Sequence, residues 1–156
     1  MENFTWQGAI SQIFFIGQIL LAIILGALIG WQREVRGKAA GGRTYALVCA
    51  GSALFTILSI NAFPGSDPAR IAAQIVVGIG FLGAGTILNR DNRIHGLTTA
   101  AGLWVSAAIG MAVGVGFYLV AIVGALLMLG VLMVNEKNII KHNDESDLNQ
   151  NDEISE

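Results

Sequence analysis

The chain has 156 residues, of which 54% are hydrophobic and 13% are charged, and it carries 20 glycines and a formal net charge of −2. This composition is typical of a membrane protein with several spans and argues against a soluble globular core. We expect no nucleic-acid partner. Cys49 is the single cysteine, so an internal disulfide is excluded, and its apolar surroundings predict a buried small side chain.

Apolar runs and short polar stretches alternate along the chain. Residues 1–9 lack the positively charged start of a signal peptide, so we expect the first apolar run to be retained. Each run is long enough to cross most of a hydrocarbon layer of about 30 Å. The sequence thus predicts an all-α fold, a bundle of five transmembrane helices in residues 10–134, with spans over 10–30, 45–63, 71–88, 97–114 and 117–134. Residues 135–156 are polar and acidic, and we expect a disordered cytoplasmic tail.

Basic residues gather in two polar connections, residues 31–44 and 89–96. If both connections are cytoplasmic, the N-terminus lies outside and the C-terminus inside, and Arg70 is the one basic residue on the outer side. The charged motif of these connections consists of Arg33, Glu34, Arg36, Arg43, Arg90, Asp91 and Arg93.

Four glycines lie in the second half of the third predicted span, namely Gly78, Gly80, Gly83 and Gly85. Each would cost an isolated soluble helix up to about 1 kcal/mol, but in lipid they allow another helix to approach closely. We therefore predict that this helix is the packing centre of the bundle. The first three glycines also form GxGxxG, but the strand and the later acid of a dinucleotide site are missing, since Leu stands at position 103.

Two stretches of the chain resemble each other. LGALIGWQREVR, from Leu25, aligns with LGAGTILNRDNR, from Leu82, and after a short gap Gly42 aligns with Gly96. Because the copies are two spans apart, they predict a parallel duplication of a helix hairpin about an axis along the membrane normal. The two charged turns would then face each other and could pair, Arg33 or Arg36 with Asp91 and Arg90 or Arg93 with Glu34. Ordinary positive-inside anchoring is the alternative, although for Arg33 and Glu34 we favour a structured pair.

Asp67 and Pro68 precede the third span and are expected to start it, as N-cap and first helical residue. Asp67 is also a weak candidate for a metal ligand, but one carboxylate offers too few oxygens for a dedicated Mg²⁺ or Ca²⁺ site. Gln74 is expected to pack between helices or to line a cavity. Trp104 is expected within the hydrocarbon, where its indole N–H needs an acceptor on another helix. The spans hold no nucleophile–base pair or paired carboxylates, so we expect neither an enzyme nor a cofactor.

Three separated motifs resemble the MgtC/SapB family of bacterial inner-membrane proteins: GALIGWQREVRGKAAGGRTYALVCAGSALF, DPARIAAQIVVGIGFLGAGTIL and HGLTTAAGLWVSAAIG. The resemblance covers residues 25–118, and its motif residues include Asp67, Arg70, Gln74, Thr98, Thr99 and Trp104. Gly42 and Gly102 stand where relatives often have Leu and Thr. Longer relatives carry a cytoplasmic ACT-like domain, so the resemblance implies a short form that lacks it.

The resemblance implies a small multi-pass domain of the bacterial inner membrane. Some relatives are linked to growth in low Mg²⁺ and to survival in host macrophages. For those relatives, action on the F-type ATP synthase has been proposed, rather than Mg²⁺ transport. The first hypothesis is therefore a non-catalytic protein that modulates a membrane partner. A small oligomeric transporter or channel for an ion or solute is the second, and a passive scaffold the third. The expected partners of the chain are the lipid bilayer, a second copy in a dimer and another inner-membrane protein.

Overall fold

The computed structural model describes residues 6–63, 65, 67–90 and 93–134. They form five helices and one β-hairpin, in the order α1 (Trp6–Val35), α2 (Gly42–Asn61), α3 (Ala69–Ala84), β1 (Leu88–Arg90), β2 (Arg93–His95), α4 (Leu97–Gly114) and α5 (Tyr118–Met133). The expected helical bundle is thus confirmed. Asp91 and the predicted acidic tail, residues 135–156, lie outside the described residues.

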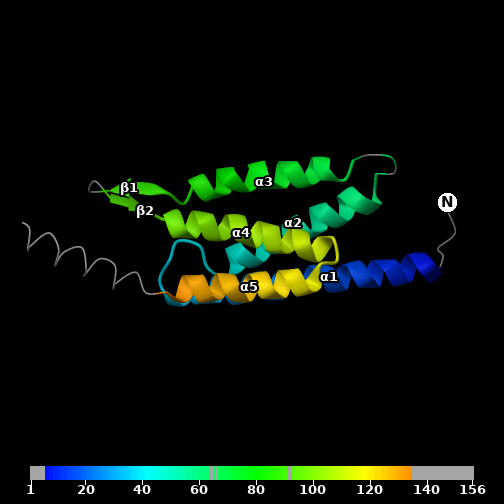
Figure 1. The fold of residues 1–156 in the computed structure, drawn as a ribbon, viewed down its shortest axis with the longest axis horizontal. Coiled ribbons are helices and arrows are strands. Elements are labelled where there is room, and N and C mark those ends of the chain that lie inside the picture. Colours follow the sequence, from blue (N-terminus) through cyan, green and yellow to red (C-terminus); the bar gives the residue numbers. More distant parts are fainter. Residues whose placement is uncertain (1–5, 64, 66, 91–92, 135–156) are drawn as a thin grey trace, which may run out of the picture.

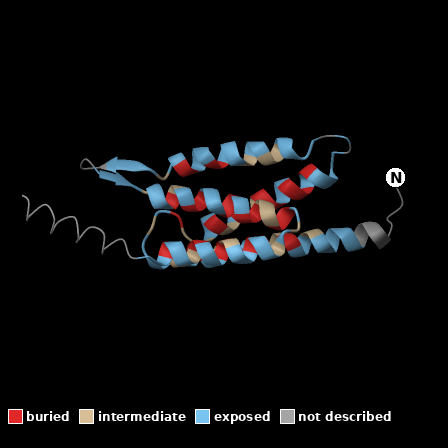
Figure 2. Ribbon diagram, in the orientation of Figure 1, coloured by how far each residue is buried: buried red, intermediate tan, exposed pale blue. Residues whose placement is uncertain are grey.

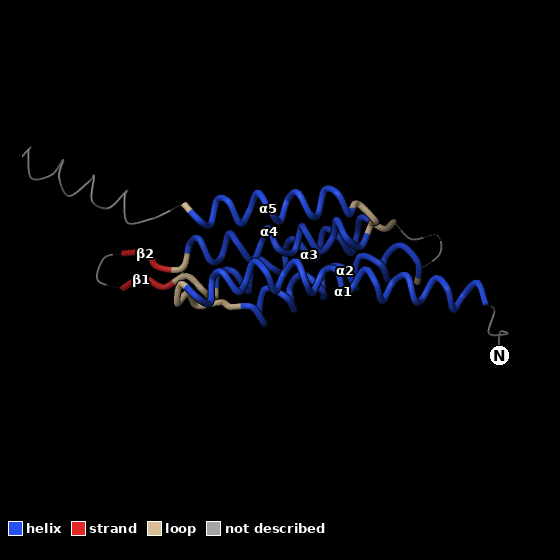
Figure 3. The backbone as a smooth tube through the Cα atoms, turned by 90° about the horizontal axis from the view of Figure 1, so that it is seen from below, coloured by secondary structure: helices blue, strands red, loops and turns tan. Residues whose placement is uncertain are grey.

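The helices lie side by side along one long axis (Figure 1). Helices α2 and α4 contact each other in the middle of the bundle. On one side α1 lies against both of them, and α5 lies against α4 and α1. Helix α3 forms the opposite edge, where its contacts are with α2 and α4. The β-hairpin joins α3 to α4 and extends from one end of the bundle, which is here named the hairpin end (Figure 3).

Three of the five helices are long and apolar enough to cross a membrane: α1 over Ile10–Val35, α2 and α4. Helices α3 and α5 are also apolar but have only 16 residues each, which corresponds to about 24 Å of helix. The five predicted spans therefore appear as five apolar helices, of which three reach spanning length.

Helix α1 ends five residues later than predicted, at Val35. Gly37 has a φ of 63° and follows the helix in a Schellman motif, in which its N–H donates to Glu34 O and the N–H of Lys38 donates to Arg33 O. Arg33 and Glu34, expected in a loop, therefore belong to the last helical turns. Gly116, with a φ of 87°, ends α4 in the same way, at the predicted boundary.

Close packing joins α4 to α2 through glycines of α4. A Cβ atom on Gly110 would collide with the carbonyl oxygen of Cys49, and one on Gly114 would lie 2.8 Å from the carbonyl oxygen of Ala53. Figure 2 shows the buried residues gathered on the facing sides of these central helices. The buried cysteine expected at position 49 is confirmed.

Helix α3 is not the packing centre within the single chain, contrary to the prediction. Its buried residues are Ile79 and Gly83, and nothing lies within 4 Å of a Cβ atom on Gly78 or Gly80. The physical reason is its position at the edge, where one side faces α2 and α4 and the rest faces outward (Figure 2).

The third predicted span also ends early, at Ala84, and Gly85 leads into a turn. Thr86 Oγ1 donates to Gly83 O at 2.8 Å, which satisfies one of the last carbonyls of α3. The chain then forms the antiparallel hairpin, in which Leu88 pairs with His95. The hairpin, which the sequence did not predict, replaces the last helical residues and the charged turn.

Candidate functional site

The last turns of α1 hold the helices together at the hairpin end. Four side chains do this, and we name them the α1 clamp: Gln32, Arg33, Glu34 and Arg36. Because they follow one another on a helix, they point in different directions and reach α2, α4 and α5. One helix end thus contacts three others.

Arg33 is the buried member of the α1 clamp, with 2% of its surface exposed. Its Nη2 donates to Thr99 Oγ1 at 3.2 Å, and the hydroxyl of Tyr45 donates to the carbonyl oxygen of Thr99 at 3.3 Å. The Tyr45 hydroxyl also lies beside the guanidinium group. A buried cation is costly unless its N–H groups are hydrogen-bonded, so Thr99 and Tyr45 stabilise this arrangement. The Nε atom of Arg33 is buried without a partner among the described residues.

Gly102 makes room for this cluster. A Cβ atom at that position would collide with the Tyr45 hydroxyl. The absence of a side chain at Gly102 therefore leaves the space that the Tyr45 hydroxyl occupies. The predicted pairing of Arg33 with Asp91 falls on a residue outside the described part of the chain.

Glu34 caps the start of α2. Its Oε2 accepts a hydrogen bond from the backbone N–H of Gly42 at 3.0 Å. A carboxylate at this place also interacts favourably with the positive end of the helix dipole. The hydrogen bond of Glu34 is thus with α2. Of the two arginines expected to pair with it, the side chain of Arg90 lies outside the described part of the chain, and Arg93 is not among its contacts there.

Gln32 and Arg36 lie one turn apart and hold the end of α5. Gln32 Nε2 donates to Leu132 O at 2.9 Å, and Arg36 Nη1 donates to the same oxygen at 2.6 Å. Arg36 Nη2 also donates to Met133 O at 3.2 Å. The last carbonyls of a helix have no partner inside the helix, and a cation is favoured there.

At the opposite end, Asp67 starts α3 as predicted. Its Oδ1 accepts a hydrogen bond from the N–H of Ala69 at 2.9 Å, and Pro68 already has helical dihedral angles, with φ −60° and ψ −24°. Ser59 Oγ of α2 donates to Pro68 O at 2.8 Å, which ties the two helices together. Among the described residues no group of three or more His, Cys, Asp or Glu is placed to hold a metal ion.

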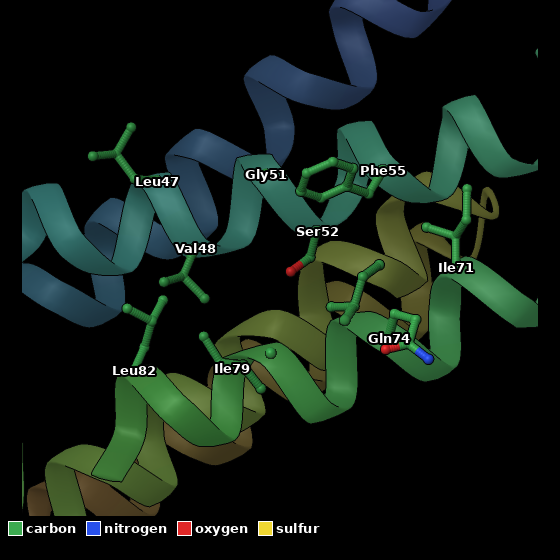
Figure 4. Close-up of a pocket in the computed structure, with 11 residues that line it drawn as sticks. Leu47, Val48, Gly51, Ser52, Phe55, Ile71, Gln74, Ile79 and Leu82 are labelled. Carbon is green, nitrogen blue, oxygen red and sulfur yellow. The ribbon is translucent and has the colours of Figure 1, made fainter. Parts of the chain in front are cut away.

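An apolar cleft, here named the α2–α3 cleft, runs between α2 and α3 (Figure 4). Its volume is about 470 Å³, and its walls include Val48, Gly51 and Phe55 of α2 and Gly78 and Leu82 of α3. A second hollow of about 410 Å³ shares Val48 and Leu82 with it and continues to Thr44 and Thr86 at the hairpin end.

The remaining residues of the predicted motif lie in different places. Thr99 is buried in the Arg33 cluster, whereas Thr98 and Arg70 are exposed. Gln74 is exposed on α3 and lines the α2–α3 cleft. Of the two expectations for this residue, packing between helices or lining a cavity, the structure agrees with the second. Trp104 is 49% exposed on α4.

Sequence reasoning missed three polar side chains that join distant helices: Tyr45, Gln32 and Gln18. Gln18 is 5% exposed, and its Nε2 donates to Val113 O of α4 at 2.8 Å. An amide in the middle of an apolar run was the available signal, since lipid offers it no partner.

Comparison with known proteins decides the family. The sequence model of the MgtC family matches residues 19–139, which is most of the chain. The chain belongs to the MgtC family. A protein of Escherichia coli strain K12 named "Putative magnesium transporter YhiD" is 53% identical over 129 residues, which are 78% of this chain and 60% of that protein. "Protein MgtC" of Salmonella typhimurium strain 14028s is 49% identical over 115 residues, covering 74% of this chain and 49% of that protein.

An uncharacterized protein of Haemophilus influenzae is 42% identical over 129 residues, which are 76% of this chain and 54% of that protein. No solved structure matches the chain significantly. This MgtC family chain therefore spans about half to three fifths of the length of these relatives. Its family and its three helices of spanning length identify it as a membrane protein.

Proposed function

We propose that this MgtC family protein is a non-catalytic component of the bacterial inner membrane that modulates a membrane partner during adaptation to low Mg²⁺ or to intracellular stress. The outer face of α3 carries the proposal. The small residues Ala73, Gly80 and Ala84 recur there at helical spacing around Val77, and all four are exposed. Small side chains are what helices use to associate in lipid. The face is therefore suited to a helix of another protein.

The proposed orientation places the hairpin end in the cytoplasm and the N-terminus outside, with all five helices crossing the bilayer. The support is the gathering of basic residues at the hairpin end, with Arg33, Arg36 and Arg43 in α1, the connection and α2, and Arg93 in β2. Single cysteines at Lys38 and Gly65, labelled from outside the cell with a membrane-impermeant maleimide, test it. Labelling at position 65 alone is expected, and labelling at position 38 alone would reverse the orientation.

The proposed duplication relates α1 and α2 to α3 and α4. The alignment that pairs Gly26 with Gly83 also pairs Ala46 with Ala100. A Cβ atom on Gly26 would lie 2.8 Å from the Cα of Ala46, and one on Gly83 would lie 3.7 Å from the Cα of Ala100. Aligned glycines thus face aligned alanines in both hairpins, which supports a common ancestor for the two halves.

The F-type ATP synthase is the partner that the family resemblance implies, and a dimer of this chain is a further proposed assembly. The tagged protein is purified from its own membranes after cross-linking, and the captured proteins are identified. Gly80→Leu fills the outer face of α3 and is expected to abolish capture. Gly17→Leu serves as the matched control, because Gly17 is also exposed with nothing within 4 Å of its missing Cβ. Equal capture by both variants would contradict the proposal.

A small transporter or channel is the second candidate. It is favoured by the printed name of the Escherichia coli relative and by Gln74, which places an amide in the wall of the α2–α3 cleft. The purified protein in liposomes, loaded with a Mg²⁺-sensitive dye, separates the two candidates. Flux that depends on Asp67 and Gln74 would support transport. Flux-free vesicles together with capture of a specific membrane complex would support the modulator.

A further inference from the structure

We propose that the α2–α3 cleft binds an anionic phospholipid from the leaflet at the hairpin end. One acyl chain lies in the cleft, and the phosphate group is held by Arg43. This inference needs neither the proposed partner nor the proposed orientation, because it concerns whichever leaflet the hairpin end faces.

The shape of the cleft comes from two missing side chains. Gly51 of α2 and Gly78 of α3 both line it, and nothing lies within 4 Å of a Cβ atom on either residue. The second hollow continues the cleft to Thr44, in the first turn of α2. Together they form an elongated space that runs along the helices toward the end of the bundle, which is the shape of an extended hydrocarbon chain.

The walls are hydrocarbon apart from two polar side chains, Ser52 and Gln74. Ser52 points toward α3, and apart from Ser52 and Gln74 the labelled side chains are aliphatic or aromatic (Figure 4). A hydrated ion would lose its water in this space and gain only the side-chain oxygens of Ser52 and Gln74, whereas an acyl chain loses no polar contacts. The chemistry therefore favours a lipid.

A cation stands at the mouth of the cleft. Arg43 is exposed in the first turn of α2. It is four residues before Leu47, which lines the cleft, so the two residues lie one turn apart on the same face of the helix. Within the described part of the chain, no hydrogen-bond or ion-pair partner is recorded for its guanidinium group. Basic pockets between membrane helices at the level of the headgroups bind anionic lipids.

The opposite mouth provides a matched control. Arg70 lies beside Ile71 and one turn from Gln74, both of which line the cleft. The carboxylate of Asp67, three residues before Arg70, lies at the same end of the cleft. The second hollow extends the cleft at the opposite end, near Thr44. An anionic headgroup is therefore expected at Arg43 and not at Arg70.

Native mass spectrometry of the purified protein tests this inference. The protein is supplied with phosphatidylglycerol and phosphatidylethanolamine that carry identical acyl chains, and the retained lipid is counted. Preference for phosphatidylglycerol is expected, and Arg43→Gln should reduce it about fivefold, which corresponds to about 1 kcal/mol for one Arg near an anionic headgroup. Arg70→Gln should leave the preference unchanged.

A second pair of variants tests the cleft itself. Gly51→Leu and Gly78→Leu should reduce the retention of both lipids, because the new side chains fill the space of the acyl chain. Gly17→Leu should not. Equal retention of the two lipids by the unmodified protein would overturn the inference, as would a reversed effect of the two arginine variants. A disulfide between Gly78→Cys chains of two copies would also overturn it, since a second copy would then occupy the cleft.

Discussion

Arg33 and Thr99 are 66 residues apart in the sequence, and a hydrogen bond of 3.2 Å joins the guanidinium of the first to the hydroxyl of the second. Both side chains are 2% exposed. The contact connects the end of α1 to the start of α4. The carbonyl oxygen of Thr99 also accepts a hydrogen bond from the hydroxyl of Tyr45, which belongs to α2. Three of the helices thus meet at one buried cation.

Replacing Thr99 by valine should destabilise the protein strongly. The variant keeps the shape of the side chain but removes the acceptor, and a hydrogen bond to a charged group contributes about 1.5–3 kcal/mol. The free energy of unfolding in detergent micelles is the quantity to measure. Thr99→Ser keeps the hydroxyl and should cost about 1 kcal/mol or less, since it loses only a methyl group.

Arg33→Met should cost less than Thr99→Val. It removes the buried charge together with its need for a partner, and replacing a buried charge by an apolar side chain of similar volume is often neutral. Thr99→Val instead leaves the guanidinium without its acceptor. The opposite order of the two unfolding free energies would show that Arg33 stabilises the fold mainly through contacts other than this hydrogen bond.

Gly110→Ala tests the packing of α4 on α2. Its new methyl group meets the backbone carbonyl of Cys49, which cannot move without shifting a helix, so we expect a loss of about 1–3 kcal/mol or a failure to fold. Gly78→Ala meets no atom within 4 Å and should be neutral or stabilising by up to about 1 kcal/mol. Thermal unfolding of both variants in the same detergent checks the difference. Similar melting temperatures would contradict the position of α3 at the edge.

These two glycines also show how far the sequence leads. Glycine content predicts that a helix can be approached closely, but it does not say which helix approaches. The four glycines of the third span therefore pointed to a packing centre, whereas glycines of α1 and α4, such as Gly26 and Gly110, lie closest to the backbone of α2. That choice depends on how the helices are arranged in space, which hydropathy along the chain does not encode.

Helix boundaries could be predicted where the local chemistry is unambiguous. The fourth helix has the predicted bounds, Leu97–Gly114, because Gly96 precedes it and Gly116 stops it. The first helix extends further than predicted because its polar residues find partners on neighbouring helices. The signal for its true end was Gly37, in the sequence RGK, rather than the first charged residue.

Arg36→Gln should loosen the end of α5. The variant removes the positive charge that donates hydrogen bonds to the carbonyl oxygens of Leu132 and Met133. A cation at the end of a helix typically stabilises it by about 0.3–1 kcal/mol. Faster hydrogen exchange is expected in peptides that cover residues 126–134, with little change in α2. Arg70→Gln, at the other end of the bundle, is the control and should leave exchange in α5 unchanged. Protection of α5 equal to that of the unmodified protein would mean that Gln32 alone holds this end.

Asp67→Ala should fray the start of α3. The carboxylate of Asp67 accepts the N–H of Ala69, and loss of an N-cap typically costs about 0.5–2 kcal/mol. Hydrogen exchange at residues 69–73 should therefore rise in the alanine variant. Asp67→Asn keeps an acceptor oxygen and should retain most of the protection, although it removes the charge that a metal site would need. The asparagine variant separates helix capping from cation binding. If Asp67→Asn lost as much protection as Asp67→Ala, the negative charge of Asp67, rather than its hydrogen bond, would be what stabilises the start of α3.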